Sequence, residues 1–185
     1  MKKSLGAVTM PLPAPVWVIG SYDGQGRANV MTASWAGICC SRPPCVGVSL
    51  QKPRYTYANI AARRAFTVHV ASAAQAKIVD WWGLASGRDC DKLARVGYTA
   101  VASELVEAPV VNELPVVMEC RLVHQVELGS HTQFIGEVLD VKVEEALLGA
   151  GGRPDAEKLD TFVFMEGYRT IGPYLGLPFA IGREI

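Results

Sequence analysis

The sequence predicts a mainly β fold, a small antiparallel β-barrel decorated by short helices. Several short, apolar, β-prone segments are separated by turn signals, whereas only two or three segments have helical periodicity. Few helices have the length that parallel crossovers need, which argues against a parallel sheet. The glycines of "GSYDGQG" (20–26) fall in a hairpin and not at the start of a helix, so there is no dinucleotide-binding fingerprint. A decorated barrel is the architecture that agrees with all three observations.

The first half of the chain is expected to supply four strands and one helix. The strands are expected at 15–22, 27–35, 45–51 and 65–70. The first two form a hairpin, because Asp23-Gly24 between apolar runs is a strong turn signal. "SRPP" (41–44) breaks the chain before the third strand. Residues 52–64 predict a loop that enters a short helix, with Thr56 as its N-cap.

The second half begins with helical segments and then becomes β again. Residues 73–86 predict a helix that ends near Gly83, and 87–97 a loop with a helical turn. From Met118 to Leu128 the even positions are mostly apolar, so this strand has one buried face. "GSH" (129–131) connects it to a strand over 132–143, whose change of phase near Val138 indicates a β-bulge. A loop or helix tail (147–158), a last strand (160–169) and an irregular C-terminus complete the chain.

Length and charge restrict the function classes. The 185 residues suit one domain (1–185), and a formal net charge of zero disfavours nucleic acid or acidic membranes as partners. No apolar run is long enough to span a bilayer, and prolines interrupt the apolar N-terminal segment in a way that speaks against a signal peptide. Five cysteines, an odd number, favour reduced thiols in a cytoplasm. "CCSRPPC" (39–45) has too few ligands, at the wrong spacing, for a zinc or iron–sulfur site, so no metal is expected.

Three polar stretches are candidates for a binding site. "ANVMTASWAG" (28–37) combines short hydrogen-bonding side chains with one large aromatic, which suits either a flat ligand or a solvent-facing strand edge. In "QKPRYTYANI" (51–60), Arg54 precedes a helix start, which suits a phosphate or is simply a capped helix with a solvated Arg. "SGRDCDK" (86–92) adds charge to the same anion or is a solvated loop. No catalytic side chain is evident, so a cofactor with its own reactivity would supply the chemistry.

Six segments, in this order, carry a resemblance to a known family: "NVMTASWAG", "SLQKPRYTYANI", "FTVHV", "SGRDCDK", "ELGSHTQFIGEVLDV" and "FVFMEGYR". Together, over about 15–168, they resemble the flavin-reductase-like family of FMN-binding split barrels, and within it the flavoredoxin type. The resemblance implies a six-stranded antiparallel split β-barrel of Greek-key type with short flanking helices. It also implies a homodimer that binds FMN near the subunit interface.

The resemblance also implies which residues bind the cofactor. Those matched to the isoalloxazine segment are Asn29, Met31, Thr32, Ala33, Ser34 and Trp35. Those matched to the phosphate segment and to later flavin contacts are Arg54, Tyr55, Thr56, Lys92, His131, Thr132 and Phe164. Lys92 and His131 are the candidates for a cation near the N1–O2 edge of the ring. The sequence departs from relatives at Gln51, Lys52 and His69 and in its cysteine cluster.

Three functions follow as alternatives. The first is an FMN-bound electron carrier that works with a redox protein partner or a nicotinamide donor. The second is an NAD(P)H:flavin oxidoreductase, with NADH or NADPH as transient donor, which passes reduced flavin to a partner. The third is a non-enzymatic flavin or haem binder. The sequence does not distinguish NADH from NADPH.

Overall fold

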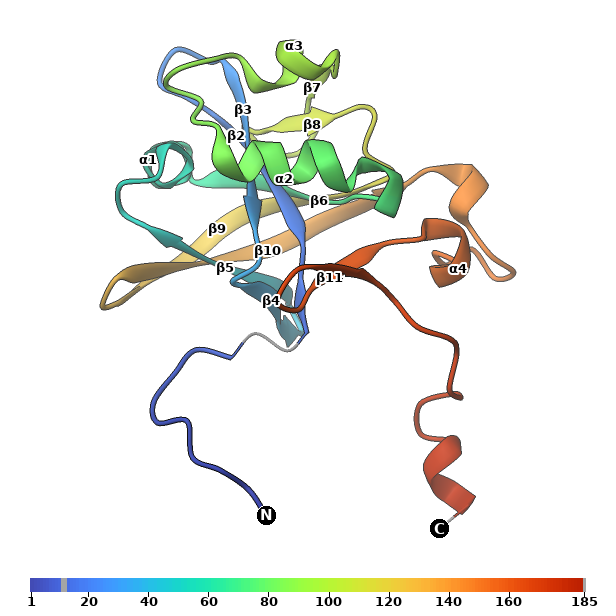
Figure 1. The fold of residues 1–185 in the computed structure, drawn as a ribbon. Coiled ribbons are helices and arrows are strands. Elements are labelled where there is room, and N and C mark those ends of the chain that lie inside the picture. The colour runs from blue at the N-terminus through green and yellow to red at the C-terminus, as the bar shows by residue number, and fades with distance from the viewer. Residues whose placement is uncertain (11–12, 185) are drawn as a thin grey trace.

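The computed structural model describes residues 1–10 and 13–184, and its centre is a seven-stranded antiparallel sheet (Figure 1). In the order β3-β2-β6-β9-β10-β5-β4, the strands are Ala28–Ala33, Trp17–Tyr22, Ala65–Val70, Val116–Leu128, His131–Val143, Pro44–Gln51 and Ala36–Ser41. The two edge strands, β3 and β4, are consecutive in the chain and only Ser34 and Trp35 separate them. The sheet therefore curls until its edges meet, and β3 contacts β5 across the opening. This arrangement is a split barrel with its seam at Ser34 and Trp35.

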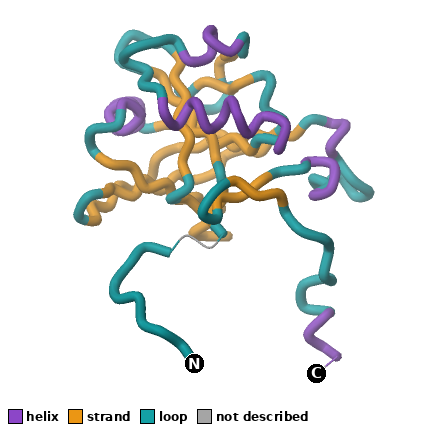
Figure 2. Tube along the Cα trace, in the orientation of Figure 1, coloured by secondary structure: helices purple, strands orange, loops and turns teal. Residues whose placement is uncertain are grey.

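Smaller elements surround the barrel (Figure 2). The helices are α1 (Tyr55–Arg63), α2 (Ala76–Leu84), α3 (Lys92–Val96) and α4 (Ala156–Leu159), with 3-10 turns η1 (Ala73–Gln75), η2 (Glu145–Leu147) and η3 (Ile181–Glu184). The short strands are β1 (Ala14–Pro15), β7 (Ala100–Ala102), β8 (Pro109–Val111), β11 (Phe162–Phe164) and β12 (Tyr168–Thr170). They form a three-stranded sheet, β1-β11-β12, and a β7–β8 hairpin. Both terminal segments extend away from the barrel on the same side (Figure 1). Among the described residues, no helix is both long and apolar enough to cross a membrane.

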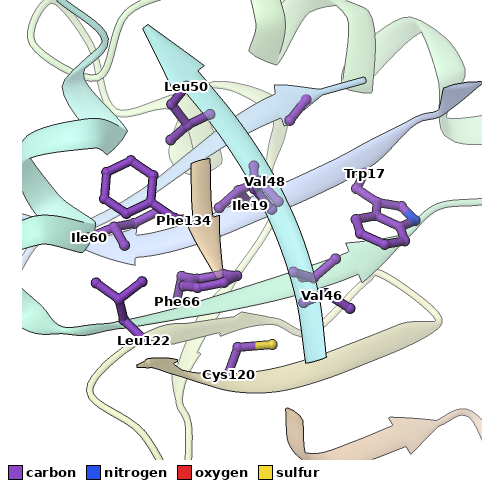
Figure 3. Packing of buried hydrophobic residues seen from close by; sticks show 12 residues of the cluster. Trp17, Ile19, Val46, Val48, Leu50, Ile60, Phe66, Cys120, Leu122 and Phe134 are labelled. Atoms are coloured by element: carbon purple, nitrogen blue, oxygen red, sulfur yellow. The ribbon is translucent and has the colours of Figure 1, made fainter. Parts of the chain in front are cut away.

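Two hydrophobic clusters lie on the two faces of β2. Trp17 and Ile19 point into the barrel, where they pack with Phe66, Phe134 and the residues shown in Figure 3. Val16 and Val18 point outward and pack under α2 against Trp82. Because both faces are buried, this strand has a continuous apolar sequence and not an alternating one. The outer cluster fixes α2 against β3, and this contact places the C-terminal end of α2 beside the seam.

Most expected elements are confirmed, including the β2–β3 hairpin, β6 over 65–70, and the irregularity between Val138 and Asp140. Four details differ. The main sheet has seven strands and not six, because β4, which the sequence did not predict, is a highly exposed edge strand without apolar alternation. The strand expected at 27–35 ends at Ala33. The last predicted strand is a hairpin, β11–β12, because Glu166 and Gly167 adopt positive φ between its halves.

The fourth difference concerns the start of α1. Arg54, and not Thr56, is the N-cap residue, and its side chain makes no capping hydrogen bond. Thr56 lies inside the first turn, is buried, and accepts a hydrogen bond from Asn29 Nδ2. The prediction failed because a Thr near a helix start can equally anchor the helix to a neighbouring strand.

Candidate functional site

Two adjoining cavities form one groove beside the seam of the barrel. Their volumes are about 290 Å³ and about 240 Å³, and they share Met31, Gln51, Arg54 and Gly83. The groove therefore lies where the ends of β3 and β5, the start of α1 and the end of α2 meet. Together the two cavities have the size of a small-molecule site, for which roughly 300–1,000 Å³ is typical.

The first cavity is lined by the β3–β4 bend and is largely uncharged. Its other lining residues are Thr32, Ala33, Ser34, Trp35, Ser49, Leu50 and His131. The backbone N–H of Ser49 donates to the Trp35 carbonyl over 2.8 Å, which holds the bend against β5. The Trp35 residue is 43% exposed, so a large aromatic surface stands open at this cavity. The small neighbours leave room for a flat ligand to approach the backbone.

Thr32 has a directed hydroxyl. It donates to the backbone carbonyl of Val79 in α2, so its proton is committed to the helix. Towards the cavity the oxygen can therefore only accept a hydrogen bond. Thr32 suits a ligand edge that presents an N–H.

The second cavity is cationic. It contains Arg54, Arg88 and Lys92 together with the N-terminal end of α1. Arg88 Nη1 donates to the Pro53 carbonyl over 3.0 Å, and its guanidinium carbon lies 5.2 Å from the centroid of the Tyr55 ring. The first-turn amides of α1 have no side-chain cap from Arg54. Helix-start amides without a side-chain cap, together with convergent cations, form a site for an anion such as phosphate.

Lys92 is 4% exposed although it is charged. Its ammonium donates to the Val30 carbonyl over 2.9 Å and to the Trp82 carbonyl over 2.7 Å. Because a lysine ammonium has three protons, one is left for the cavity that Lys92 lines. Burial lowers the pKa of Lys92 to about 8. The lysine is thus a fixed positive charge at neutral pH that an anion would stabilise.

A buried polar network supports the wall of the second cavity. Asn29 Nδ2 donates to Thr56 Oγ1 over 2.9 Å, and Asn59 Nδ2 donates to Ser21 Oγ over 3.1 Å. Asn29 Oδ1 is buried without a partner among the described residues and abuts Gly87. A Cβ at Gly87 would collide with that oxygen and would lie 2.9 Å from Tyr55 Cδ1. Only glycine lets the 86–88 loop approach this closely.

Asp23 holds the Tyr55 ring in place through the ring's hydroxyl. Tyr55 OH donates to Asp23 Oδ2 over 2.8 Å, and Arg27 Nε donates to the same oxygen over 2.8 Å. Burial alone would raise the pKa of Asp23, but hydrogen bonds from Arg27, Tyr55 and Gln25 hold it well below its usual range. The carboxylate therefore stays ionised and anchors the start of α1 to the β2–β3 turn.

Most of the predicted cofactor residues line this groove. Asn29, Tyr55, Thr56 and Lys92 border the second cavity, Met31 and Arg54 border both, and the remainder of the 32–35 segment and His131 border the first. The structure does not bring Thr132 or Phe164 to the groove. Thr132 is fully buried and its hydroxyl donates to Tyr57 OH over 3.4 Å. Phe164 lies in β11 and packs against the outer cluster.

Apart from the predicted cofactor residues, five groove residues lie outside the three candidate stretches. Ser49 and Leu50 border the first cavity, Leu84 and Ala85 the second, and Gly83 both. The sequence placed the end of a helix near Gly83, but nothing in it indicated that this end faces the β3–β4 bend. Ser49 carried a weak signal, as a polar residue in an apolar strand.

These residues match the donors and acceptors of a flavin nucleotide, with its anionic phosphate and a flat ring whose edge carries one N–H and several acceptors. The curled barrel, the small-residue bend at its seam and the adjoining cationic cavity define a flavin-binding split barrel. The chain belongs to the flavin-reductase-like family. The family model described as "Flavin reductase like domain" matches residues 9–168.

Individual relatives agree with this assignment. The solved structure of flavoredoxin from Desulfovibrio vulgaris (Miyazaki F) has 46% sequence identity and a TM-score of 0.93, over 98% of this chain and 100% of that one. An NADPH-flavin oxidoreductase of Streptomyces viridifaciens is 30% identical over 82% of this chain and 75% of that protein. A high molecular weight rubredoxin of Moorella thermoacetica is 30% identical over 91% of this chain and 69% of that protein.

Proposed function

We propose that the chain binds FMN in this groove and works as an electron-transfer flavoprotein of the flavoredoxin type. The observation that carries the proposal is the junction of a largely uncharged cavity with a cationic one, through four shared residues. Bound flavin would supply the redox chemistry, which no arrangement of side chains in the groove offers by itself. The similarity to the Desulfovibrio flavoredoxin over nearly the whole of both chains supports this choice.

The second cavity would hold the phosphate. Arg54, Arg88 and Lys92 would balance its negative charge, and N–H groups at the positive end of α1 would donate hydrogen bonds to its oxygens. Tyr55 and Thr56 belong to the same helical turn, which Asp23 and Asn29 keep in place. Arg88 closes this end through its bond to Pro53, which favours a mononucleotide over a longer dinucleotide.

The first cavity would hold the ring. Trp35 offers an aromatic surface, Thr32 an acceptor, and Met31, Ala33 and Ser34 leave the backbone accessible. His131 borders this cavity whereas Lys92 borders the other, so His131 is the better candidate for a cation at the N1–O2 edge. Such a cation would raise the midpoint potential. The potential should drop in His131→Ala and change little in Lys92→Ala, and the reverse result would exchange the two assignments.

An NAD(P)H:flavin oxidoreductase is the second candidate. The observation that favours it is the identity with the Streptomyces oxidoreductase, together with the exposed Trp35 face, where a second planar ligand could stack. A non-enzymatic flavin or haem binder is the remaining alternative. It would retain its ligand without reduction by either nicotinamide.

We further propose a cytoplasmic homodimer that exchanges electrons with a redox protein. Large apolar side chains stand open on the edge strand β4 and the C-terminal segment, with Ile38 at 81% and Phe179 at 91% exposure. Covering them with a second copy would remove apolar surface from water. The rubredoxin relative supports a protein as electron partner. Size-exclusion chromatography with light scattering would determine the oligomeric state.

The test is the visible spectrum of the purified protein, repeated without oxygen after NADH and then NADPH are added. An oxidised-flavin spectrum, with FMN released on denaturation, would support the cofactor assignment. Bleaching by one nucleotide, with turnover in excess free FMN, would indicate the reductase. A flavin that neither nucleotide bleaches would indicate a carrier. A colourless protein that FMN cannot reconstitute would refute the proposal.

A further inference from the structure

Three of the five cysteines lie on one hairpin, β4–β5, and the proposed flavin site uses none of them. Cys39 and Cys40 are exposed on β4, and Cys45 is buried on β5. A turn of two residues, 42–43, joins the strands. Among the described residues, no group of three or more His, Cys, Asp and Glu side chains is placed to hold a metal ion.

The strand register selects one pair of thiols. Ser41 pairs with Pro44 beside the turn, and Cys40 is the direct antiparallel partner of Cys45. Directly opposed residues point to the same face of a sheet, with Cα atoms roughly 4.5–5.5 Å apart. A disulfide spans Cα separations of about 4.4–6.8 Å, so the register places this pair within disulfide range. Cys39 falls at the register irregularity between Ile38 and Cys40 and has no partner on β5.

The two thiols differ in access. Cys40 is exposed to solvent, whereas Cys45 is 7% exposed in the wall of the barrel, opposite Glu137 of β10. Burial raises the pKa of Cys45, and the neighbouring thiols of Cys40 and Cys39 raise it further. An external reagent therefore reaches Cys40 first, and Cys45 reacts only with a sulfur already beside it.

We propose that Cys40 and Cys45 form a reversible intramolecular disulfide by exchange with a low-molecular-weight disulfide. The Cys40 thiolate attacks one sulfur of the reagent, which forms a mixed disulfide and releases one small thiolate. The Cys45 thiolate then attacks the Cys40 sulfur, which forms the Cys40–Cys45 bond and releases the second small thiolate. The two protein thiols are oxidised by two electrons, and their two protons pass to the two small thiolates.

The disulfide would link β4 to β5 at the edge of the barrel. β5 ends in the groove, and β4 begins directly after the Trp35 bend that lines it. Exchange nonetheless takes place at the far end of the hairpin from Trp35 and does not require flavin. The inference therefore stands or falls separately from the proposed function.

Glutathione disulfide is a suitable probe on the full-length protein with whatever cofactor it carries. After incubation, free thiols are alkylated and the protein is digested with trypsin without reduction. Arg42 and Lys52 both precede proline, which blocks trypsin, so Cys39, Cys40 and Cys45 remain in one peptide. We expect that peptide to lose two hydrogens and to fragment as a Cys40–Cys45 ring, reversibly with dithiothreitol.

The variants separate the pairings. The Cys39→Ser variant should form the Cys40–Cys45 disulfide as the wild type does. The Cys45→Ser variant should accumulate the mixed disulfide of glutathione with Cys40. In the wild type, that adduct should persist longer at pH 7 than at pH 9, because the raised pKa of Cys45 slows the second step at lower pH. A Cys39–Cys45 ring, an adduct that never closes at pH 9, or disulfide-linked dimers in place of the ring would overturn the proposal.

Discussion

Replacing Gly87 with alanine tests whether the 86–88 loop shapes the cationic cavity. An added Cβ would collide with Asn29 Oδ1 and would lie 3.0 Å from Asn29 Cγ and 2.9 Å from Tyr55 Cδ1. Non-bonded heavy atoms pack best at about 3.5–4.0 Å, so relieving the collision with Asn29 Oδ1 requires the loop to retreat by about 1 Å or more. The displacement carries Arg88 away from Pro53 and from the face of Tyr55.

The expected cost follows from the packing. Overpacking of this kind costs about 1–3 kcal/mol. If the cost falls on the bound state, the FMN dissociation constant rises about 5- to 150-fold. The assay is fluorescence titration of apoprotein with FMN, with the melting temperature of the apoprotein measured in parallel. Gly24→Ala is the matched control, because a Cβ there has no heavy atom within 4 Å and no positive φ opposes it.

A double variant identifies the colliding partner. Asn29→Ala removes the oxygen that a methyl group at position 87 would strike, so Gly87→Ala should cost less in that background than in the wild type. This coupling is the signature of direct contact. Equal affinity for FMN in Gly87→Ala and the wild type would refute the reasoning. So would strictly additive effects of the two substitutions, because the methyl group at position 87 would then not act through Asn29.

Three further predictions concern buried groups. His69 is fully buried between the Val18 carbonyl and the Val111 amide, and burial lowers its pKa to about 4. The stability that neutral His69 contributes is complete above the unfolded pKa of about 6.5 and is lost as the pH falls towards 4, which lowers the free energy of unfolding by about 3 kcal/mol. Urea unfolding measured across this pH range should show the decrease in the wild type and not in His69→Gln. With the pKa of Lys92 at about 8, FMN affinity should weaken as the pH rises through 8, and titration of Lys92→Met should give a flat profile in that range. At Gly136 a Cβ would lie 2.5 Å from Phe66 Cζ, so Gly136→Ala should lower the free energy of unfolding by about 1–3 kcal/mol, whereas Gly37→Ala, with open space around it, should not; equal unfolding midpoints would contradict this.

The sequence predicted those elements whose pattern reflects burial on one face. The first half of β10 is of this kind, and the irregularity near Val138 was also predicted. The single buried face expected for β9 was wrong, because both faces of its first half are covered and residues 124–128 are exposed. The sequence missed β4 because this edge strand has one neighbour in the sheet and four consecutive exposed residues, from Ile38 to Ser41. Pairing with β5, and not burial, makes it a strand, and such pairing leaves no periodic signal.

The sequence predicted those site residues whose chemical type and whose place at the end of a strand or the start of a helix both suggest binding. Short polar side chains and Trp35 near the end of a strand indicated the first cavity, and Arg54 before a helix indicated the cationic one. Thr132, which was expected at the cofactor, does not line the groove, and the sequence carried a signal for its burial. Thr132 shares the alternation of Phe134 and Gly136, all three of which are buried, so its side chain points into the barrel and not towards the groove.

The same geometry explains why a strand beside the core carries so little bulk. β3 and β4 are the two edges of one sheet, and the chain crosses from one to the other through two residues. At that crossing Ala33 is buried at 6% exposure and Thr32 is hydrogen-bonded to α2, so larger side chains would push the seam apart. Residues 32–34 therefore need small side chains for two reasons. Small side chains let the barrel close, and they leave the backbone accessible to a flat ligand. Trp35 is the first position beyond that constraint, and it is there that the chain places its aromatic surface.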